Sequence, residues 1–581
     1  MASVLTLTTL ISALGSLPLS HAVPHRPYPL SNAPSVPTVS FSNGTVLGSS
    51  SAGVDTFWGI PYAQPPVGDL RFRAPVALDA TFGILNATSP PTACPQLPSD
   101  YDPKSYTFVE SSVINQYIAY SHPDADMDED CLTLNIQRPS STNSESKLPV
   151  VFWIYGGGFN QGSNKESPWE QFVADSASIG HPVLVVAINY RLAAFGFLGG
   201  SQIQAEGSSN VGLRDQRLAL KWVADNIESF GGDPDNVTIW GESAGAWSVL
   251  YQMLIEGGDN TYNDKPLFHG GIMNSGAGLP ATPIDGAEAQ GSFDAIAEAA
   301  NCSAEAVGEG NELECLRKMP WDAFNNVTDV VPSLFTYTGV VIAFPPRPDS
   351  SDSFFPLSPE AAIRQGKIAR VPIITGNQAD EGALFAITLY NGTTIDKFVN
   401  GNLHYTYPSA PISVVTDFVN TYSTDPAKGA PFGTGDNDLL YPNSKRNAAV
   451  IGDLLFEFQR RNLLEHTADL IPAWSYSAVY NRTTNVLGTA HGTDLALFGN
   501  QKPEVAYKHI SQWYLSFINY QDPNKIDESS GYGSRLTHWP RYTAQGKAMI
   551  QFDVKNESII RDDYRQQSYD YFKTVISSIK L

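Results

Sequence analysis

One stretch near the middle of the chain decides the fold: residues 237–250, with the sequence VTIWGESAGAWSVL. It begins with apolar, β-branched residues typical of a strand, passes through a Gly-x-Ser-x-Gly turn at Gly241–Gly245, and then has no Gly or Pro before Leu250. A serine on so sharp a strand-to-helix turn has a strained backbone, and only small residues let the two elements pack that close. We therefore interpret Ser243 as a candidate nucleophile at a helix N-terminus, where free N–H groups favour developing negative charge. The alternative is a chance match in a chain rich in Gly and Ser.

A second glycine-rich segment follows an apolar run. Residues 148–155 (LPVVFWIY) are continuously apolar, as expected for a central strand of a parallel sheet that is covered on both faces. They lead directly into Gly156, Gly157 and Gly158, and then Phe159. Consecutive glycines cost conformational entropy, and they make sense where backbone N–H groups must approach a ligand such as the oxyanion of an acyl-transfer intermediate. A flexible surface turn is the alternative.

The order of the remaining elements favours an α/β fold. We predict further strands at 182–190, 270–276, 371–376 and 473–477. We also predict one amphipathic helix at 210–226. Asp380 and Glu381 follow one of these strands, and His491 follows a later one. The chain order serine, acid, histidine is that of α/β-hydrolases. We expect a large, mostly parallel central sheet with helices on both faces.

The first residues and the composition indicate a secreted protein. Residues 1–22 are predicted to be a signal peptide, because the apolar run at 4–19 precedes the small-x-small pattern Ser20-His21-Ala22. No linker or repeat divides residues 23–581, which we interpret as a single catalytic domain. No later stretch reaches the length of a membrane span, so we expect no membrane anchor.

The net charge limits the kinds of partner, and the glycosylation sequons are consistent with secretion. The formal net charge of −23 argues against nucleic acid as a partner. Eight Asn-x-Ser/Thr sequons are typical of a secreted glycoprotein; they begin at Asn43, Asn86, Asn236, Asn301, Asn326, Asn391, Asn481 and Asn556. No metal-ligand spacing is present, and we expect no cofactor and no metal site.

Four cysteines allow three disulfide pairings. Cys302 and Cys315 lie close together in one helical region, which leaves Cys94 with Cys131. The second pair closes a loop of residues 95–130, in which apolar residues recur at helical spacing over 109–118. This short amphipathic helix is either an ordinary buried helix or a movable lid over a pocket.

Together these stretches resemble the type-B carboxylesterase and lipase family of α/β-hydrolases, which includes the cholinesterases. The matching segments extend over most of the chain: Gly59–Gly68, Glu129–Leu132, Gly156–Phe159, Asn189–Arg191, Phe195–Leu198, Gly212–Ala219, Gly241–Gly245, Asp380–Gly382 and His491–Gly492. Within the family, the chain is most similar to the secreted lipases of yeasts and filamentous fungi at Gly257–Asn263, Ala430–Phe432 and the 95–130 loop.

The resemblance implies an α/β-hydrolase fold and a serine ester hydrolase. It implies Ser243 as the nucleophile, His491 as the general base and then acid, and Glu381 as the residue that orients the imidazole. Gly157, Gly158 and Ala244 would donate N–H groups to the oxyanion. It also implies two disulfides and two structural ion pairs: Cys94–Cys131, Cys302–Cys315, Arg71–Glu129 and Arg191–Asp215.

The function that we predict is a secreted lipase acting on long-chain acyl esters, with an ester or lipid substrate at a lipid–water interface. A carboxylesterase for small soluble esters is the alternative, and the two would share the same three residues. A catalytically inactive binding module of the same family would lack the serine or the histidine, whereas this chain has both. The sequence leaves the oligomeric state open.

Overall fold

In the computed structural model, the described residues are 36–97, 126–166, 169–336, 340–480, 485–495, 504–526, 536–554 and 556–581. The predicted signal peptide at 1–22 and the predicted lid helix at 109–118 lie outside these residues. Residues Pro37–Leu581 form one compact unit. Among the described helices, none combines the length and the apolar character needed to cross a membrane.

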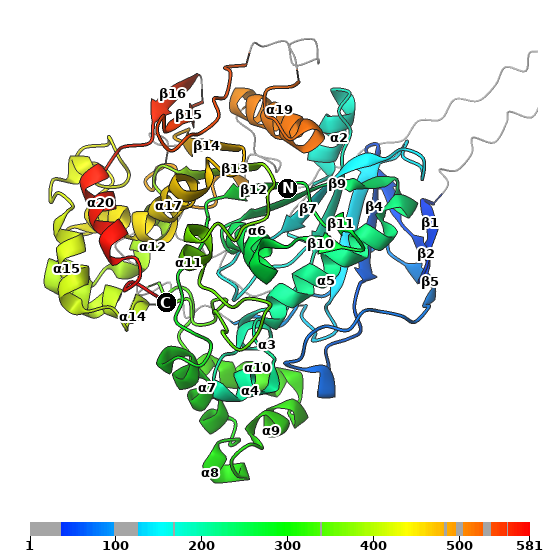
Figure 1. Cartoon of the computed structure of the whole chain (residues 1–581), viewed down its shortest axis with the longest axis horizontal. Coiled ribbons are helices and arrows are strands. Elements are labelled where there is room, and N and C mark those ends of the chain that lie inside the picture. The colour runs from blue at the N-terminus through cyan, green and yellow to red at the C-terminus, as the bar shows by residue number, and fades with distance from the viewer. Residues whose placement is uncertain are drawn as a thin grey trace, which may run out of the picture. The chain divides into compact units, whose positions relative to one another are not determined.

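An eleven-stranded sheet organises this unit (Figure 1). Across the sheet, its strands are β16 (Glu557–Arg561), β15 (Ala548–Phe552), β14 (Ala473–Ala478), β13 (Ile373–Gln378), β12 (Gly270–Asn274), β9 (Gly232–Glu242), β7 (Leu148–Ile154), β8 (Leu184–Ile188), β6 (Thr133–Pro139), β4 (Val54–Pro61) and β3 (Ser49–Ser51). The seven strands from β15 to β8 are parallel. The outer pairs β16–β15, β8–β6, β6–β4 and β4–β3 are antiparallel. The predicted mostly parallel sheet is confirmed.

Two smaller sheets lie outside the large one. One consists of β1 (Thr38–Phe41), β2 (Gly44–Leu47) and β5 (Gly83–Asn86), and the other is the hairpin of β10 (Thr261–Tyr262) and β11 (Lys265–Pro266). The predicted central strands all exist, but β9 begins at Gly232, earlier than the apolar run suggested. Its extra residues include Pro234, which the apolar pattern does not mark as strand.

Both faces of the large sheet are buried, and this explains the continuous apolar run in β7. Val150 and Phe152 belong to one hydrophobic cluster, while Val151 and Trp153 belong to a second cluster. Successive side chains of a strand point to opposite faces, so the two clusters lie on opposite sides of the sheet. All four side chains are almost fully buried.

Helices cover the two faces, as predicted. On one side lie α5 (Val211–Asn226) and α6 (Ala244–Leu254), and on the other lie α2 (Glu170–Ser178) and α19 (Glu504–Tyr520) (Figure 1). The helix predicted at 210–226 is thereby confirmed as α5. The two-sided cover positions the carboxyl ends of the parallel strands, where ligands bind in open α/β sheets.

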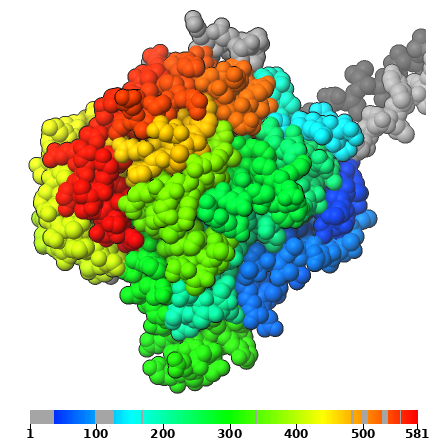
Figure 2. Space-filling model, viewed as in Figure 1, coloured from blue at the N-terminus to red at the C-terminus, as the bar shows by residue number. Residues whose placement is uncertain are grey.

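The remaining helices are short and lie mostly in the C-terminal half: α3 (Ala193–Phe197), α4 (Ser201–Glu206), α7 (Ala287–Ala299), α8 (Ala304–Val307), α9 (Glu312–Lys318), α10 (Trp321–Val327), α11 (Pro359–Arg364), α12 (Gly382–Ala386), α13 (Ile395–Phe398), α14 (His404–Thr406), α15 (Ile412–Asn420), α16 (Ser444–Gly452), α17 (Phe458–Thr467) and α20 (Gln566–Val575). In the space-filling view, the red C-terminal segment that contains α20 packs against the yellow segment that contains α15 and α17 (Figure 2).

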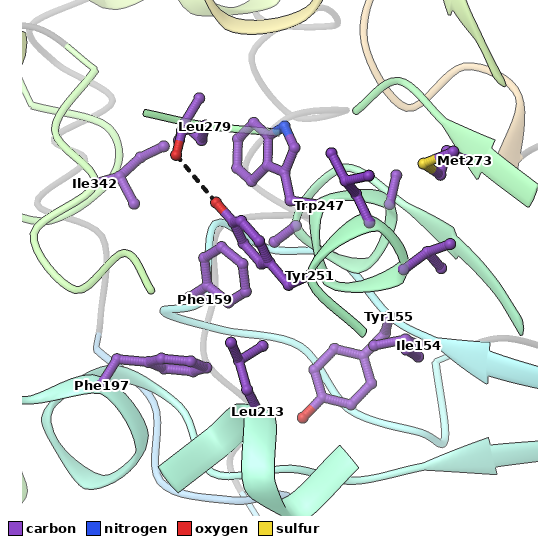
Figure 3. Close-up of a cluster of buried hydrophobic side chains, with 14 of the residues drawn as sticks. Ile154, Tyr155, Phe159, Phe197, Leu213, Trp247, Tyr251, Met273, Leu279 and Ile342 are labelled. Carbon is purple, nitrogen blue, oxygen red and sulfur yellow. Dashed lines mark hydrogen bonds between the residues drawn. The ribbon is translucent and has the colours of Figure 1, made fainter. Parts of the chain in front are cut away.

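Helix α6, which follows the turn at Ser243, is anchored by aromatic side chains (Figure 3). Trp247 and Tyr251 pack against Phe159, with ring centroids 6.1 and 6.3 Å away. The Tyr251 hydroxyl donates a 3.2 Å hydrogen bond to the carbonyl oxygen of Leu279. Because Phe159 directly follows the three glycines, the same cluster ties α6 to the glycine-rich loop.

The structure confirms both disulfides. Cys94 is bonded to Cys131, and Cys302 is bonded to Cys315. The first bond joins the two ends of the predicted lid loop, while the second joins the segment before α8 to α9.

Both implied ion pairs are present and buried. Arg71 donates two hydrogen bonds to Glu129, at 2.5 and 2.8 Å. The Arg191 guanidinium donates to both oxygens of Asp215, at 2.9 and 2.7 Å. The side chains of Arg191 and Asp215 are 2% and 0% exposed, so removing either charge leaves the other unpaired in a dry environment.

We expect Asp215→Asn to lower the free energy of unfolding by on the order of 3 kcal/mol, because Arg191 loses its buried counter-charge. Asp235→Asn is the matched control, since Asp235 pairs with Lys265 at the surface, where an ion pair contributes little. Urea unfolding followed by tryptophan fluorescence measures both variants. Equal midpoints for the two variants would contradict a stabilising role for the buried pair.

Candidate active site

Ser243 lies between β9 and α6 with φ 56° and ψ −123°, a strained conformation for a residue with a side chain. A Cβ at Gly241 would lie 2.3 Å from the backbone of Gly245, and a Cβ at Gly245 would lie 2.0 Å from the carbonyl oxygen of Ile154. No other residue fits at either position. The predicted strand–turn–helix geometry is therefore present, and its physical cause is the close approach of β9, β7 and α6.

Three side chains far apart in the sequence form one hydrogen-bonded chain. His491 Nε2 lies 2.8 Å from Ser243 Oγ, and His491 Nδ1 lies 2.6 Å from Glu381 Oε2. All three residues are buried or nearly so. A carboxylate at Nδ1 accepts a hydrogen bond from the N–H there, which leaves the lone pair of Nε2 free to accept a hydrogen bond from the serine hydroxyl.

The carboxyl ends of neighbouring strands bring these groups together. Ser243 follows β9, Glu381 follows β13, and His491 lies in the segment 485–495 after β14. The Ser243 N–H donates to the carbonyl oxygen of Asn274, at the end of β12 between them. Glu381 Oε1 accepts a 2.8 Å hydrogen bond from the N–H of Gln378, which fixes the carboxylate.

Asp380, the other acid of the predicted pair, faces a different way. Its Oδ2 accepts a hydrogen bond from the N–H of Thr489 at 2.9 Å, and its Oδ1 accepts one from the N–H of Phe432 at 2.8 Å. Asp380 thus anchors the segment that carries His491, whereas Glu381 contacts the imidazole itself.

The glycine-rich loop lies against Ser243. A Cβ at Gly156 would lie 2.9 Å from Ser243 Cβ, and a Cβ at Gly157 would lie 2.2 Å from the carbonyl oxygen of Gln161. Gly157 and Gly158 have φ of 93° and 64°, a region that favours glycine. Within the described part of the chain, no backbone carbonyl accepts a hydrogen bond from the N–H of either glycine or of Ala244, the first residue of α6. These donors are available for an anion.

Two further carboxylates surround the imidazole, and the sequence interpretation missed both. Glu242 Oε1 lies 3.5 Å from His491 Nε2, and burial raises the pKa of Glu242 to about 8. Asp494 accepts a 2.8 Å hydrogen bond from Asn274, and burial raises its pKa to about 6. Glu242 belongs to the Gly-x-Ser-x-Gly turn and Asp494 lies three residues after His491, but the sequence does not show in which direction either side chain points.

The pKa of His491 reflects this crowding. Burial by itself would lower that pKa, but the neighbouring carboxylates outweigh the effect and raise it to about 9: Glu242 acts through its charge, and Glu381 acts through its charge and its hydrogen bond. Because Glu242 and His491 lie in contact, the two groups titrate together as a pair. The site favours the protonated imidazole that forms when Ser243 gives up its proton.

Aromatic rings form the apolar wall beside His491. The rings of Phe385 and Phe456 lie 5.2 and 4.5 Å from the imidazole. Phe456 also stacks on Trp247 at 5.7 Å. It lies in a π-helical turn, Asp453–Glu457, and such turns often occur at functional sites. Both rings are almost fully buried, so the imidazole is held in an apolar environment.

The sequence matches the carboxylesterase family over residues 35–572. The chain belongs to this family. It is accordingly a carboxylic ester hydrolase, as predicted. It is 40% identical to secreted lipase 1 of Botryotinia fuckeliana, with 98% of each chain covered. It is 42% identical to a secreted triacylglycerol lipase of Gibberella zeae, with 92% of this chain and 89% of the relative covered.

A solved structure shows the same fold. The crystal structure of Aspergillus niger EstA superposes with a TM-score of 0.76 at 24% identity, covering 94% of this chain and 99% of that chain. The α/β-hydrolase fold is thereby confirmed. Among the described residues, no group of three or more His, Cys, Asp or Glu side chains is arranged to hold a metal ion.

We expect Glu242→Gln to move the acid limb of the pH profile of kcat/KM to lower pH. The imidazole must be neutral to accept the serine proton, so activity falls as the pH drops below the pKa of His491. Glutamine removes one of the carboxylates that raise this pKa, so the base stays neutral at more acidic pH. Hydrolysis of p-nitrophenyl butyrate over about pH 5 to 9 measures the shift.

Glu256→Gln is the control, because Glu256 is a half-exposed carboxylate beyond the end of α6. Its profile should equal that of the wild type. An active Glu242→Gln enzyme with an unshifted acid limb would show that Glu242 does not act on His491.

Proposed function

We propose that the protein is a secreted lipase in which Ser243, His491 and Glu381 form the catalytic triad. The observation that carries the proposal is the hydrogen-bonded chain from Ser243 Oγ through the imidazole to the Glu381 carboxylate. A serine hydroxyl becomes a useful nucleophile only when a positioned base takes its proton. Cation stabilisation by Glu381 makes that transfer easier.

In the first half of the reaction, Ser243 Oγ attacks the ester carbonyl carbon while its proton moves to His491 Nε2. The tetrahedral intermediate places a negative charge on the former carbonyl oxygen, and the N–H groups of Gly157, Gly158 and Ala244 would donate to it. Collapse of the intermediate breaks the bond to the alcohol, which takes the proton from His491 and leaves. The acyl group stays on Ser243 as an ester.

In the second half, a water molecule gives a proton to His491 and attacks the acyl carbon. A second oxyanion forms in the same place and collapses, releasing the carboxylic acid, and the proton returns from His491 to Ser243. Each step keeps the imidazole between the same two partners. The reaction therefore needs little movement of protein groups.

The names of the relatives support a lipase rather than an esterase for small soluble esters. The relatives at 37–42% identity are named lipases, and they cover more than 90% of this chain. Secretion is proposed from relatives that are named secreted lipases. The signal peptide and the glycosylation of the sequons stay predictions.

We expect Ser243→Ala and His491→Ala each to lower kcat for p-nitrophenyl butyrate by several orders of magnitude, because triad members act as a unit. Ser248→Ala is the control: Ser248 lies on the next turn of α6, accepts a hydrogen bond from Gln216, and does not contact His491. It should keep wild-type turnover. A folded Ser243→Ala protein with near-normal turnover would refute the triad.

We expect hydrolysis of tributyrin to rise sharply above its solubility limit, because a lipase acts at the surface of an ester emulsion. In a series of p-nitrophenyl esters, kcat/KM should also increase from acetate to the longer acyl chains, because a longer chain buries more methylene groups when it binds. A hyperbolic tributyrin curve without a break, together with a preference for acetate, would identify a carboxylesterase for small soluble esters instead.

A further inference from the structure

A fully buried arginine lies behind the candidate triad. Arg460 is in α17, and its side chain is 0% exposed. Its Nη1 donates to Ser475 Oγ at 2.8 Å and to Asp562 Oδ2 at 2.9 Å. Its Nη2 donates to Asp562 Oδ1 at 3.0 Å and also to Glu457. These contacts hold the guanidinium rigidly against β14 and the segment after β16.

The remaining donor of Arg460 points towards the site. Arg460 Nε donates a 2.8 Å hydrogen bond to Asn377 Oδ1. Asn377 lies near the end of β13 and is 1% exposed. An asparagine amide can present either its oxygen or its NH₂ group to a neighbour. Because the guanidinium only donates, it selects the orientation in which the Asn377 oxygen faces Arg460.

That orientation directs the NH₂ group of Asn377 at the triad carboxylate. Asn377 Nδ2 lies 3.4 Å from Glu381 Oε1 and donates to it, alongside the N–H of Gln378. The other oxygen of Glu381, Oε2, is then left to accept the hydrogen bond from the N–H at His491 Nδ1. A turned amide would present its oxygen to the carboxylate, which is repulsive, and Glu381 Oε1 would lose one of its two donors.

We propose that Arg460 is a positioning residue of the active site, which acts through Asn377 on Glu381. The inference rests on the proposed triad, and no contact of Arg460 with Ser243 or His491 is involved. The hydrogen-bonded chain is continuous from Asp562 through Arg460, Asn377 and Glu381 to His491. It couples the segment after β16, the last strand of the large sheet, to the orientation of His491.

Arg461 supplies a matched control, because it occupies the same charge cluster without the contact to Asn377. Its Nε donates to Asp562 Oδ1 at 2.9 Å, and its Nη1 donates to the carbonyl oxygen of Tyr564 at 3.1 Å. Like Arg460, it is fully buried and pairs with Asp562. Replacing either arginine by lysine therefore disturbs the same ion cluster, but only one replacement frees the amide of Asn377.

The test compares Arg460→Lys with Arg461→Lys. Both should lose a similar amount of thermal stability. For p-nitrophenyl butyrate, Arg460→Lys should lower kcat about tenfold or more with little change in KM. The acid limb of its pH profile should also move to higher pH. The reason is that Glu381, having lost a hydrogen-bond donor, holds the imidazolium proton of His491 more strongly. Arg461→Lys should keep the kcat and acid limb of the wild type. Equal kcat losses in the two variants, or none in either, would overturn the proposal.

Asn377→Asp tests the same step without removing the arginine. The new carboxylate can still accept from Arg460, so the cluster keeps its contacts, but it cannot donate to Glu381 when ionised. We expect the same fall in kcat and the same direction of shift in the acid limb. Wild-type kinetics in a folded Asn377→Asp enzyme would refute the role of the amide.

A double-mutant cycle with Glu381→Gln separates this proposal from the triad assignment. If Asn377 acts through Glu381, then Asn377→Asp should lower kcat in the wild-type background and cause little further loss in the Glu381→Gln background. Additive losses would show that Asn377 acts by another route and would overturn the proposal. Wild-type kcat in the Glu381→Gln single variant would instead show that the triad assignment itself is wrong.

Discussion

The close approach of three backbones at one turn is the constraint on which the rest of the structure depends. The Cα of Gly245 lies so near the carbonyl oxygen of Ile154 that a single added carbon would overlap it. This contact brings the start of α6 to the end of β7, and so places Ser243 beside the glycine-rich loop. The strained φ of Ser243 is maintained because the buried aromatic cluster around Trp247 holds α6 in place.

An excess of carboxylates around one imidazole is the second feature that shapes the site. Glu242, Glu381 and Asp494 all act on His491, and each is almost fully buried. Burying like charges together is costly, and the protein meets this cost by retaining protons, as the raised pKa values of Glu242 and Asp494 show. In the mechanism that we propose, the same arrangement would stabilise the positive charge on His491 in the transition state.

Much of the fold and of the site was predictable because it depends on local patterns. The turn around Ser243 and the glycines at 156–158 have short sequence signatures with a steric cause, and the structure shows that cause directly. The pairing of the four cysteines was predictable because two of them, Cys302 and Cys315, are close in sequence. The choice of Glu381 over Asp380 came from family resemblance alone. In the structure, Asp380 turns away to hold the backbone of Thr489.

The sequence by itself determined the order of the elements, the strained turn at Ser243 and the loop that faces it, because each is specified by neighbouring residues. Only the tertiary structure decided which distant charges meet at His491 and behind it. Arg460 and Asn377 are 83 positions apart, and their contact depends on how α17 packs across the ends of β13 and β14. A buried charge has no periodic signature in the sequence, since its partners are chosen by packing and by the cost of leaving it unpaired.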